Sequence, residues 1–579
     1  MSGKGKSTRL PSAFPTETLP DKFGFFFQEK IEKIRSSLDK CVSQNLIPEH
    51  EPFHGKPLDS FQVVSEKEIK DLIKSSSPKS CDLDPIPTSL LVRHFDSLCS
   101  VVTQIINDSL ASGIVPKPFK HAIIKPLLKK PTLCPEDLKN YRPVSNLPFL
   151  SKILEKVVLK QLKVHLTNNG LFDNYQSAYK EHHNTETALL KIFNDLLSAE
   201  DEGNISFLVL LDLSAAFDTI DHTILLDRLF HSYGISGTVL KWLSSYLNDR
   251  TQCVSVNGIT SACFDLKFGV PQGSVLGPIL YTLYTKPLSK IISSHNLQYH
   301  MYADDTQLQK SFSCSDYDEV ITTLESCIED VKNWMIGNKL QLNSDKTECL
   351  LFDTRDKLKS KDVKHLHVGH DIVPFNAKAR NLGVFFDHQL SMETHINHLC
   401  KQLYLEMRRI GAMVKFLDET SKKTLVSAFI LSRLDYCNSL FLNLPNNTLD
   451  RLQKSQNNAA RMIMNKKKRD HVTSIFRHLH WLPVRSRIQY KVSIFCFKCL
   501  NGSAPSYLSD LVPLYTPSRS LRSSGKHLIT EQTSRLKKFG DRSFKVAAPK
   551  IWNSLPQNLR SCTSEKEFRR KLKTHLFNK

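Results

Sequence analysis

The chain has 579 residues, which is too long for one hydrophobic core, so we expect several domains in contact. With 40% hydrophobic and 24% charged residues, the composition is that of a globular protein and excludes a wholly disordered chain. The 14 cysteines are scattered and do not form the framework of a small disulfide-rich secreted domain. Neither a signal-peptide core nor a run of about 18 apolar residues is present, so we expect a soluble intracellular protein that does not enter membranes.

The positive charge is concentrated at one end of the chain. The formal net charge is +21, from 79 Lys and Arg against 58 Asp and Glu. Residues 451–579 contain 28 of the basic and 6 of the acidic residues, which leaves 51 and 52 for residues 1–450. A one-sided basic block is what neutralisation of nucleic-acid phosphates requires, and a solvated surface that aids solubility is the alternative.

Hydrophobic periodicity and turn signals predict the elements of the first half in chain order. We expect helices over 22–45, over 66–76 behind a Ser65–Glu68 capping box, and over 89–113, and then a strand over 121–130. The helix that follows YRPVSNLPFL should bury one face, composed of Ile153, Leu154, Val157, Val158 and Leu162. An apolar strand over 205–213 precedes a mainly helical stretch over 222–248.

In the second half, the strand-like runs QCVSVNG and FDLKFGV are expected to form a hairpin through Asn257-Gly258. A helix over 274–294 is followed by a tight hairpin over 297–310 and a long helix over 316–338. Strands are predicted near 347–353 and 381–386. Beyond residue 391 the pattern is helical to about residue 500, and loops with short helices follow.

Three acidic residues occupy positions at which packing alone gives no reason for a carboxylate. Asp212 ends the apolar strand, and Asp304 and Asp305 occupy the hairpin tip, where adjacent acids repel each other unless cations are near. If the two strands are neighbours in a sheet, Asp212 and Asp304 come together, as in sites that hold two Mg²⁺ ions for phosphoryl displacement. The alternatives are an ordinary Asp-rich turn and a strand-end cap.

Several motifs follow one another in the chain: NYRPVSNLPFLSKILEKVV (140–158), FLVLLDLSAAFDTIDH (207–222), GVPQGSVLGPILY (269–281), MYADD (301–305), NSDKTECLLF (343–352) and NLGVFFD (381–387). In this order they resemble the reverse transcriptase of non-LTR (LINE-type, Jockey-like) retrotransposons. The helices that carry LSRLDYCNSL and LQKSQNNAARMI resemble the thumb of Jockey-related elements, and the resemblance covers about residues 60–465.

The resemblance implies an α+β right-hand polymerase with fingers, a palm with an antiparallel sheet, a helical thumb, and a basic, mainly helical C-terminal segment. The expected divisions are an N-terminal extension (1–60), a helical linker (61–120), fingers and palm (121–365), primer grip and thumb (366–470), and the basic segment (471–579). Many such relatives carry an apurinic-type endonuclease domain before this region, and residues 1–60 show no sign of one.

The resemblance also implies roles at the centre of the reaction. Asp212 and Asp304, with Asp305 as a weaker third, correspond to the ligands of two Mg²⁺ ions, for which Mn²⁺ is the alternative. Lys346 corresponds to the lysine that protonates the departing pyrophosphate, although exposed lysines are common.

Further roles concern the nucleotide. Phe217 corresponds to the aromatic residue that blocks a ribose 2′-OH, with a core phenylalanine as the alternative. Gln272 should face the base pair being formed, and Gly269 and Gly273 should let the backbone approach a nucleotide closely.

Basic residues are expected to meet phosphates. Arg142 and Lys125 correspond to the fingers residues that contact triphosphate or template. The family has Gly, an aromatic residue and Arg where this chain has Ala178, Tyr179 and Lys180. Lys180 can meet a phosphate as a point charge but lacks the bidentate guanidinium fork.

The function implied is RNA-directed DNA polymerase activity on an RNA template, a DNA primer and dNTPs, in the nucleus as well as the cytoplasm. An inactive or co-opted nucleic-acid-binding remnant of such an element is the alternative of another class. A maturase-like or telomerase-like enzyme is disfavoured by LDYCNSL.

Cys496 and Cys499 form a CxxC that we interpret as core thiols rather than a metal site. The run 466–469 (KKKR) is either a nuclear localisation signal or nucleic-acid contact, or a solvated helix end.

Overall fold

A computed structural model describes residues 10–41, 52–77, 80–358, 365–369, 371–516 and 527–578. Its tertiary contacts divide the chain into two compact units. Unit 1 comprises Met1–Asp173, Leu213–Ile291 and Glu329–Asn343, and unit 2 comprises Asn174–Asp212, Ile292–Ile328 and Ser344–Lys579. Both units combine helices with sheets, which confirms the α+β class. None of the helices in the described ranges has the length and apolar composition needed to cross a membrane.

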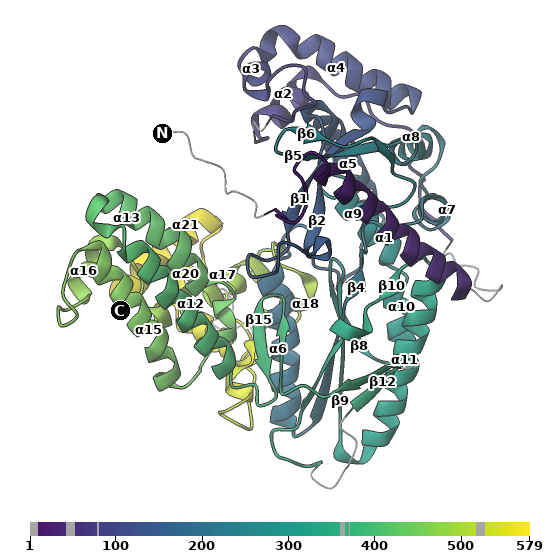
Figure 1. The fold of residues 1–579 in the computed structure, drawn as a ribbon. Coiled ribbons are helices and arrows are strands. Elements are labelled where there is room, and N and C mark those ends of the chain that lie inside the picture. The colour runs from purple at the N-terminus through teal and green to yellow at the C-terminus, as the bar shows by residue number, and fades with distance from the viewer. Residues whose placement is uncertain are drawn as a thin grey trace. The chain divides into compact units, whose positions relative to one another are not determined.

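Unit 1 consists of a mixed sheet and of helices that range from 6 residues in α3 to 23 residues in α1 (Figure 1). Its helices are α1 (Leu19–Cys41), α2 (Glu66–Lys74), α3 (Thr88–Arg93), α4 (Phe95–Ser112), α5 (Phe149–Asn168), α7 (His222–Tyr233), α8 (Gly237–Leu247), α9 (Gly277–Thr285) and α10 (Leu288–Ser294), of which α10 ends in unit 2. Its strands are β1 (His121–Leu128), β2 (Tyr141–Asn146), β4 (Leu213–Ser214), β5 (Thr251–Val256), β6 (Ile259–Thr260), β7 (Phe264–Asp265) and β10 (Gln341–Leu342).

Local signals account for the helix boundaries of unit 1. The capping box is confirmed: Ser65 Oγ accepts from Glu68 N at 3.3 Å, and Glu68 Oε2 accepts from Ser65 N at 3.1 Å. All five residues predicted for the buried face of α5 are buried. The single helix predicted over 89–113 is divided into α3 and α4, because His94 leaves the helical region at φ −106°, ψ 22°.

The mixed sheet has the order β2-β1-β5-β6, with β7 also paired to β5. Strand β1 is antiparallel to β2 and parallel to β5. The predicted hairpin is half right. Asn257 and Gly258 form the turn, both at positive φ, but they lead into β6, which has only two residues. The strand-like run FDLKFGV is not the second strand of that hairpin, and only its Phe264 and Asp265 pair with β5.

Helix α1 covers one face of this sheet with an apolar stripe. The cluster comprises Leu19, Phe23, Phe27, Ile124, Tyr141, Val254 and Val256. The Phe23 ring meets the Tyr141 ring edge-on, with the ring centroids 5.0 Å apart. Aromatic residues at helical spacing therefore dock α1 onto β1, β2 and β5.

Unit 2 is built around an antiparallel four-stranded sheet. Its order is β11 (Glu348–Phe352), β3 (Ile205–Leu211), β9 (Asp305–Phe312), β8 (Gln298–Tyr302). Two hairpins follow, formed by β12 (His365–Val368) with β13 (Asp371–Pro374) and by β14 (Lys378–Asn381) with β15 (Val384–Asp387). Helix α6 (Thr185–Glu202) packs on β3 and β8, and α11 (Tyr317–Gly337) begins here and ends in unit 1 (Figure 1).

Residues 393–500 of unit 2 are mainly helical, as predicted, and loops with further helices follow. The helices are α12 (Glu393–Gly411), α13 (Glu419–Val426), α14 (Ser432–Asp435), α15 (Asn446–Ile463), α16 (Thr473–Leu479), α17 (Val484–Leu500), α18 (Ser506–Ser509), α19 (Phe544–Asn553), α20 (Gln557–Arg560) and α21 (Glu565–Asn578). They share one large core with α6 and the sheet. Cys496 and Cys499 are buried in α17, as expected for core thiols.

We expect Phe23→Ala to destabilise the mixed sheet of unit 1 by about 3–5 kcal/mol, because it leaves a cavity between α1 and β2. Phe25→Ala on the same helix is the matched control, since Phe25 is 62% exposed and its loss should cost less than about 1 kcal/mol. Native-state hydrogen exchange of the amides of β1 and β5 measures both. Equal exchange in the two variants would contradict the docking described for α1.

Candidate active site

Strand register brings the three predicted carboxylates to one end of the sheet in unit 2. Strand β3 is central and almost wholly buried, and Leu211 pairs with Thr306 of β9. The next residues, Asp212 and Asp305, therefore face each other across the two strands. Asp304 belongs to the two-residue turn that joins β8 to β9, as predicted for the hairpin tip.

The three carboxylates repel one another. Loss of hydration, together with the negative charges of Asp304 and then Asp212, raises the pKa of Asp305 to about 6, even though part of its surface meets solvent. Lys346 opposes the shift and forms an ion pair with Asp212, with Nζ 2.8 Å from Oδ2. It lies in the turn before β11, the other neighbour of β3.

This donor set fits a hard divalent cation. Carboxylate oxygens are the ligands that Mg²⁺ and Mn²⁺ prefer, and a cation would relieve the repulsion that raises the pKa of Asp305. The lysine is 63% exposed and can move aside without leaving a cavity.

A buried glutamine that sequence reasoning missed fixes the hairpin tip. Gln176 Oε1 accepts from the backbone N–H groups of Ala303 and Ala178, both at 3.0 Å, and its Nε2 donates to the carbonyl of Ala303 at 3.3 Å. The backbone of Tyr175 and Ser177 also bonds to Met301 of β8. Ala303 holds a positive φ of 56°, so these bonds stabilise a strained turn directly before Asp304.

The segment with Gln176 is itself anchored to the C-terminal helices. Ser177 Oγ lies 2.8 Å from His300 Nε2 and 2.9 Å from Tyr507 Oη, and Tyr507 donates to Thr187 Oγ1 at 3.1 Å. Burial lowers the pKa of His300 to about 3, so the ring is neutral in this network. A residue of α18 thus supports the turn that carries the acids.

Two of the residues predicted to contact the nucleotide lie in unit 1. Phe217 is half-buried and stacks on Tyr281, with ring centroids 4.6 Å apart. Gln272 Nε2 donates to both carboxylate oxygens of Asp218, at 2.7 and 2.8 Å, a partner that the motif alone did not reveal. Burial raises the pKa of Asp218 to about 6, and the bond from Gln272 opposes that shift.

The two glycines of this motif are required by contacts within the protein. Gly269 has a φ of +78°, and a Cβ there would lie 2.7 Å from the backbone of Asp218. Gly273 has a φ of +127°, and a Cβ there would lie 2.5 Å from the carbonyl oxygen of Ser145. The close approach that was expected for a nucleotide is thus made by neighbouring protein backbone.

The predicted basic residues are divided between the units. Lys125 of β1 and Arg142 of β2 share an exposed face of the mixed sheet of unit 1, and Lys125 Nζ lies 3.5 Å from Asp82 Oδ2. Lys180 belongs to unit 2 and is half-buried. It follows Tyr179, whose pKa is raised by burial and then by the charge of Asp304, which places this loop beside the hairpin tip.

Comparison with known proteins identifies a region that contains the predicted site residues with the exception of Lys125. The family model described as reverse transcriptase (RNA-dependent DNA polymerase) matches residues 128–384. That region is a reverse-transcriptase domain, and the resemblance to LINE-type enzymes is confirmed.

Three similar curated proteins come from mobile elements of Drosophila melanogaster. The RNA-directed DNA polymerase from mobile element jockey is 26% identical, over 61% of this chain and 38% of that protein. The probable RNA-directed DNA polymerase from transposon BS is 26% identical, over 68% and 42%, and that from transposon X-element is 23% identical, over 75% and 46%. The chain therefore spans less than half the length of these relatives.

We expect Gln176→Ala to loosen the hairpin tip by about 1–3 kcal/mol, because it leaves buried backbone groups of Ala303 and Ala178 without their partner. Hydrogen exchange of the peptide over 298–309 should become faster. Gln298→Ala, at the exposed start of β8, is the control and should leave the exchange unchanged. A tip that stays equally protected in Gln176→Ala would show that the glutamine does not hold it.

Proposed function

We propose that this chain is an RNA-directed DNA polymerase of a non-LTR retrotransposon, which adds dNTPs to a primer 3′-OH on an RNA template. The convergence of Asp212, Asp304 and Asp305 at one end of an antiparallel sheet carries the proposal. The match of residues 128–384 to the reverse-transcriptase family and the names of the relatives support it.

In this proposal, Asp212 and Asp304, with Asp305 as a third ligand, would hold two Mg²⁺ ions. When bound, such ions activate the primer hydroxyl and neutralise the triphosphate. The primer 3′-OH would release its proton to solvent, its oxygen would form a bond to the α-phosphorus, and the bond from that phosphorus to pyrophosphate would break. Lys346, whose Nζ lies 2.8 Å from Asp212 Oδ2, would donate a proton to the departing pyrophosphate.

We assign the right-hand parts as follows. The sheet β11-β3-β9-β8 would be the palm, and the mixed sheet that exposes Lys125 and Arg142 would belong to the fingers. Hairpin β14–β15 would grip the primer, and α12 to α15 would form the thumb. The basic segment 471–579 would follow the thumb. RNA, a DNA primer and dNTPs would be the partners, and the protein would act in the nucleus.

The decisive test is primer extension on poly(rA)/oligo(dT) with Mg²⁺ and dTTP. We expect extension by the wild type and a loss of about a thousandfold or more in Asp304→Ala/Asp305→Ala and in Asp212→Asn, since each removes metal ligands. Asp371→Asn, on the exposed strand β13, is the matched control and should retain full activity.

Absence of extension by a folded wild type that still binds RNA would overturn the proposal. The remaining function would then be that of an inactive nucleic-acid-binding remnant. Equal activity in the wild type and the double variant would instead move the metal site away from the hairpin tip.

We further propose that Phe217 excludes the ribose 2′-OH. Phe217→Ala should raise the incorporation of rNTP relative to dNTP on the order of tenfold, because a side chain that fills the space of one hydroxyl is removed. The ratio of kcat/KM for rUTP and dTTP on poly(rA) measures the effect.

Phe230→Ala serves as the control, since Phe230 is a half-exposed ring in the same unit. An unchanged ratio together with lower stability would assign Phe217 to the core through its stacking on Tyr281.

A further inference from the structure

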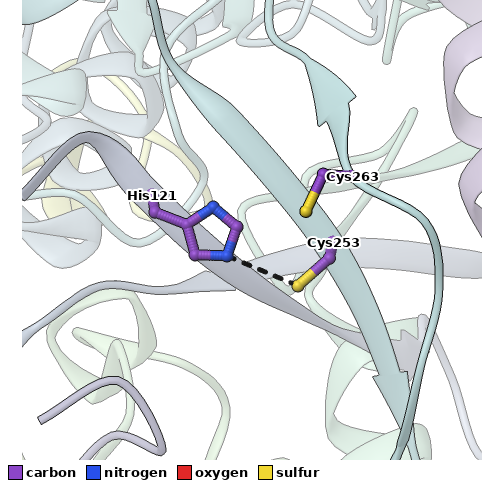
Figure 2. A group of neighbouring side chains, drawn as sticks. All are labelled: His121, Cys253 and Cys263. Carbon is purple, nitrogen blue, oxygen red and sulfur yellow. Dashed lines mark hydrogen bonds between the residues drawn. The ribbon is translucent and has the colours of Figure 1, made fainter. Parts of the chain in front are cut away.

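The mixed sheet of unit 1 places three metal-binding side chains on one face. The parallel register pairs Ile123 of β1 with Cys253 of β5, so His121, two positions earlier, lies on the same face as Cys253. The antiparallel pairing of β5 with β7 brings Cys263, the residue before β7, opposite Cys253. Figure 2 shows the imidazole and the two thiols pointing toward one another from these three segments.

The separations suit a tetrahedral metal ion. His121 Nε2 lies 3.5 Å from Cys253 Sγ, and the three donor atoms all lie within 4.8 Å of one another. Bonds of about 2.0–2.3 Å in a tetrahedral zinc site separate neighbouring ligand atoms by about 3.3–3.8 Å. The imidazole–thiol pair already has this spacing. Cys263 is exposed and can close the remaining distance by a small rotation of its side chain.

The imidazole is oriented as a ligand should be. His121 Nδ1 forms a hydrogen bond of 2.8 Å with Thr251 Oγ1, and its other nitrogen faces the thiols. A hydrogen bond at one ring nitrogen that fixes the tautomer and directs the other nitrogen is the usual support of a metal-bound histidine. A disulfide between Cys253 and Cys263 would not require the imidazole nitrogen of His121 to face the two sulfur atoms.

We propose that His121, Cys253 and Cys263 bind a Zn²⁺ ion. Two thiolates and an imidazole select a soft or borderline ion over Mg²⁺. Cys263 is exposed, so a water molecule would be able to supply the fourth ligand. Strands β6 and β7 have two residues each, so few backbone bonds hold the segment 259–265 against β5. The ion would clamp this segment to β1 and β5.

The test is to purify the full chain without chelator under reducing conditions and to measure its metal content by elemental mass spectrometry. We expect about one zinc per chain, lost in His121→Gln and in Cys263→Ser. Cys134→Ser is the matched control, because Cys134 is another exposed cysteine of unit 1. Cys263 is exposed, so its variant should keep the fold, which circular dichroism checks.

Two further measurements separate ligation from general effects on folding. Co²⁺ added to the zinc-free protein should give thiolate-to-cobalt absorption in the near ultraviolet, which disappears in Cys263→Ser and persists in Cys134→Ser. Removal of zinc should accelerate hydrogen exchange over 259–265. Absence of zinc and of the cobalt band in the wild type would overturn the proposal, as would undiminished zinc in both ligand variants. A Cys253–Cys263 disulfide in protein that was never exposed to oxidant would overturn it as well.

Discussion

The register of β3 against β9 is the constraint on which the rest of unit 2 depends. It pairs Leu211 with Thr306 and so sets Asp212 beside Asp305. Because side chains alternate between the two faces of a strand, a slip of one residue would turn one of these carboxylates to the opposite face. The buried side chains of β3 hold the register, since a slip would misplace all of them at once. The packing of an apolar strand thus fixes the geometry of charged groups outside it.

The three carboxylates at the end of the sheet are held in position, but their negative charge is neutralised only in part. The groups that fix the hairpin tip are neutral: the amide of Gln176, backbone groups of Met301, and the uncharged ring of His300. Lys346 is the cation that contacts Asp212, and it sits on an exposed, flexible side chain. Rigid neutral support combined with a displaceable cation keeps the carboxylates preorganised, and their field remains available to an incoming metal ion.

The sequence predicted those features whose signals are local. The capping box at Ser65, the buried face of α5 and the hairpin around Asp304 each depend on residues within a few positions of one another. Gln176 and the bond between Gln272 and Asp218 could not be predicted, because their partners are 127 and 54 positions away and polar side chains have no periodicity that reveals a partner. The run FDLKFGV has the composition of a strand, but β5 pairs with only two of its residues.

The basic C-terminal segment shows why charge and packing must be considered separately. The segment contributes Trp552, Phe568 and Leu572 to the core of unit 2, and its Tyr507 joins the network behind the hairpin tip. In α21 the apolar residues recur at helical spacing, and the lysines and arginines occupy the remaining positions. An excess of positive charge can therefore accumulate on such helices at little cost to the core. The excess of positive charge and the support of the hairpin tip are thus properties of the same segment.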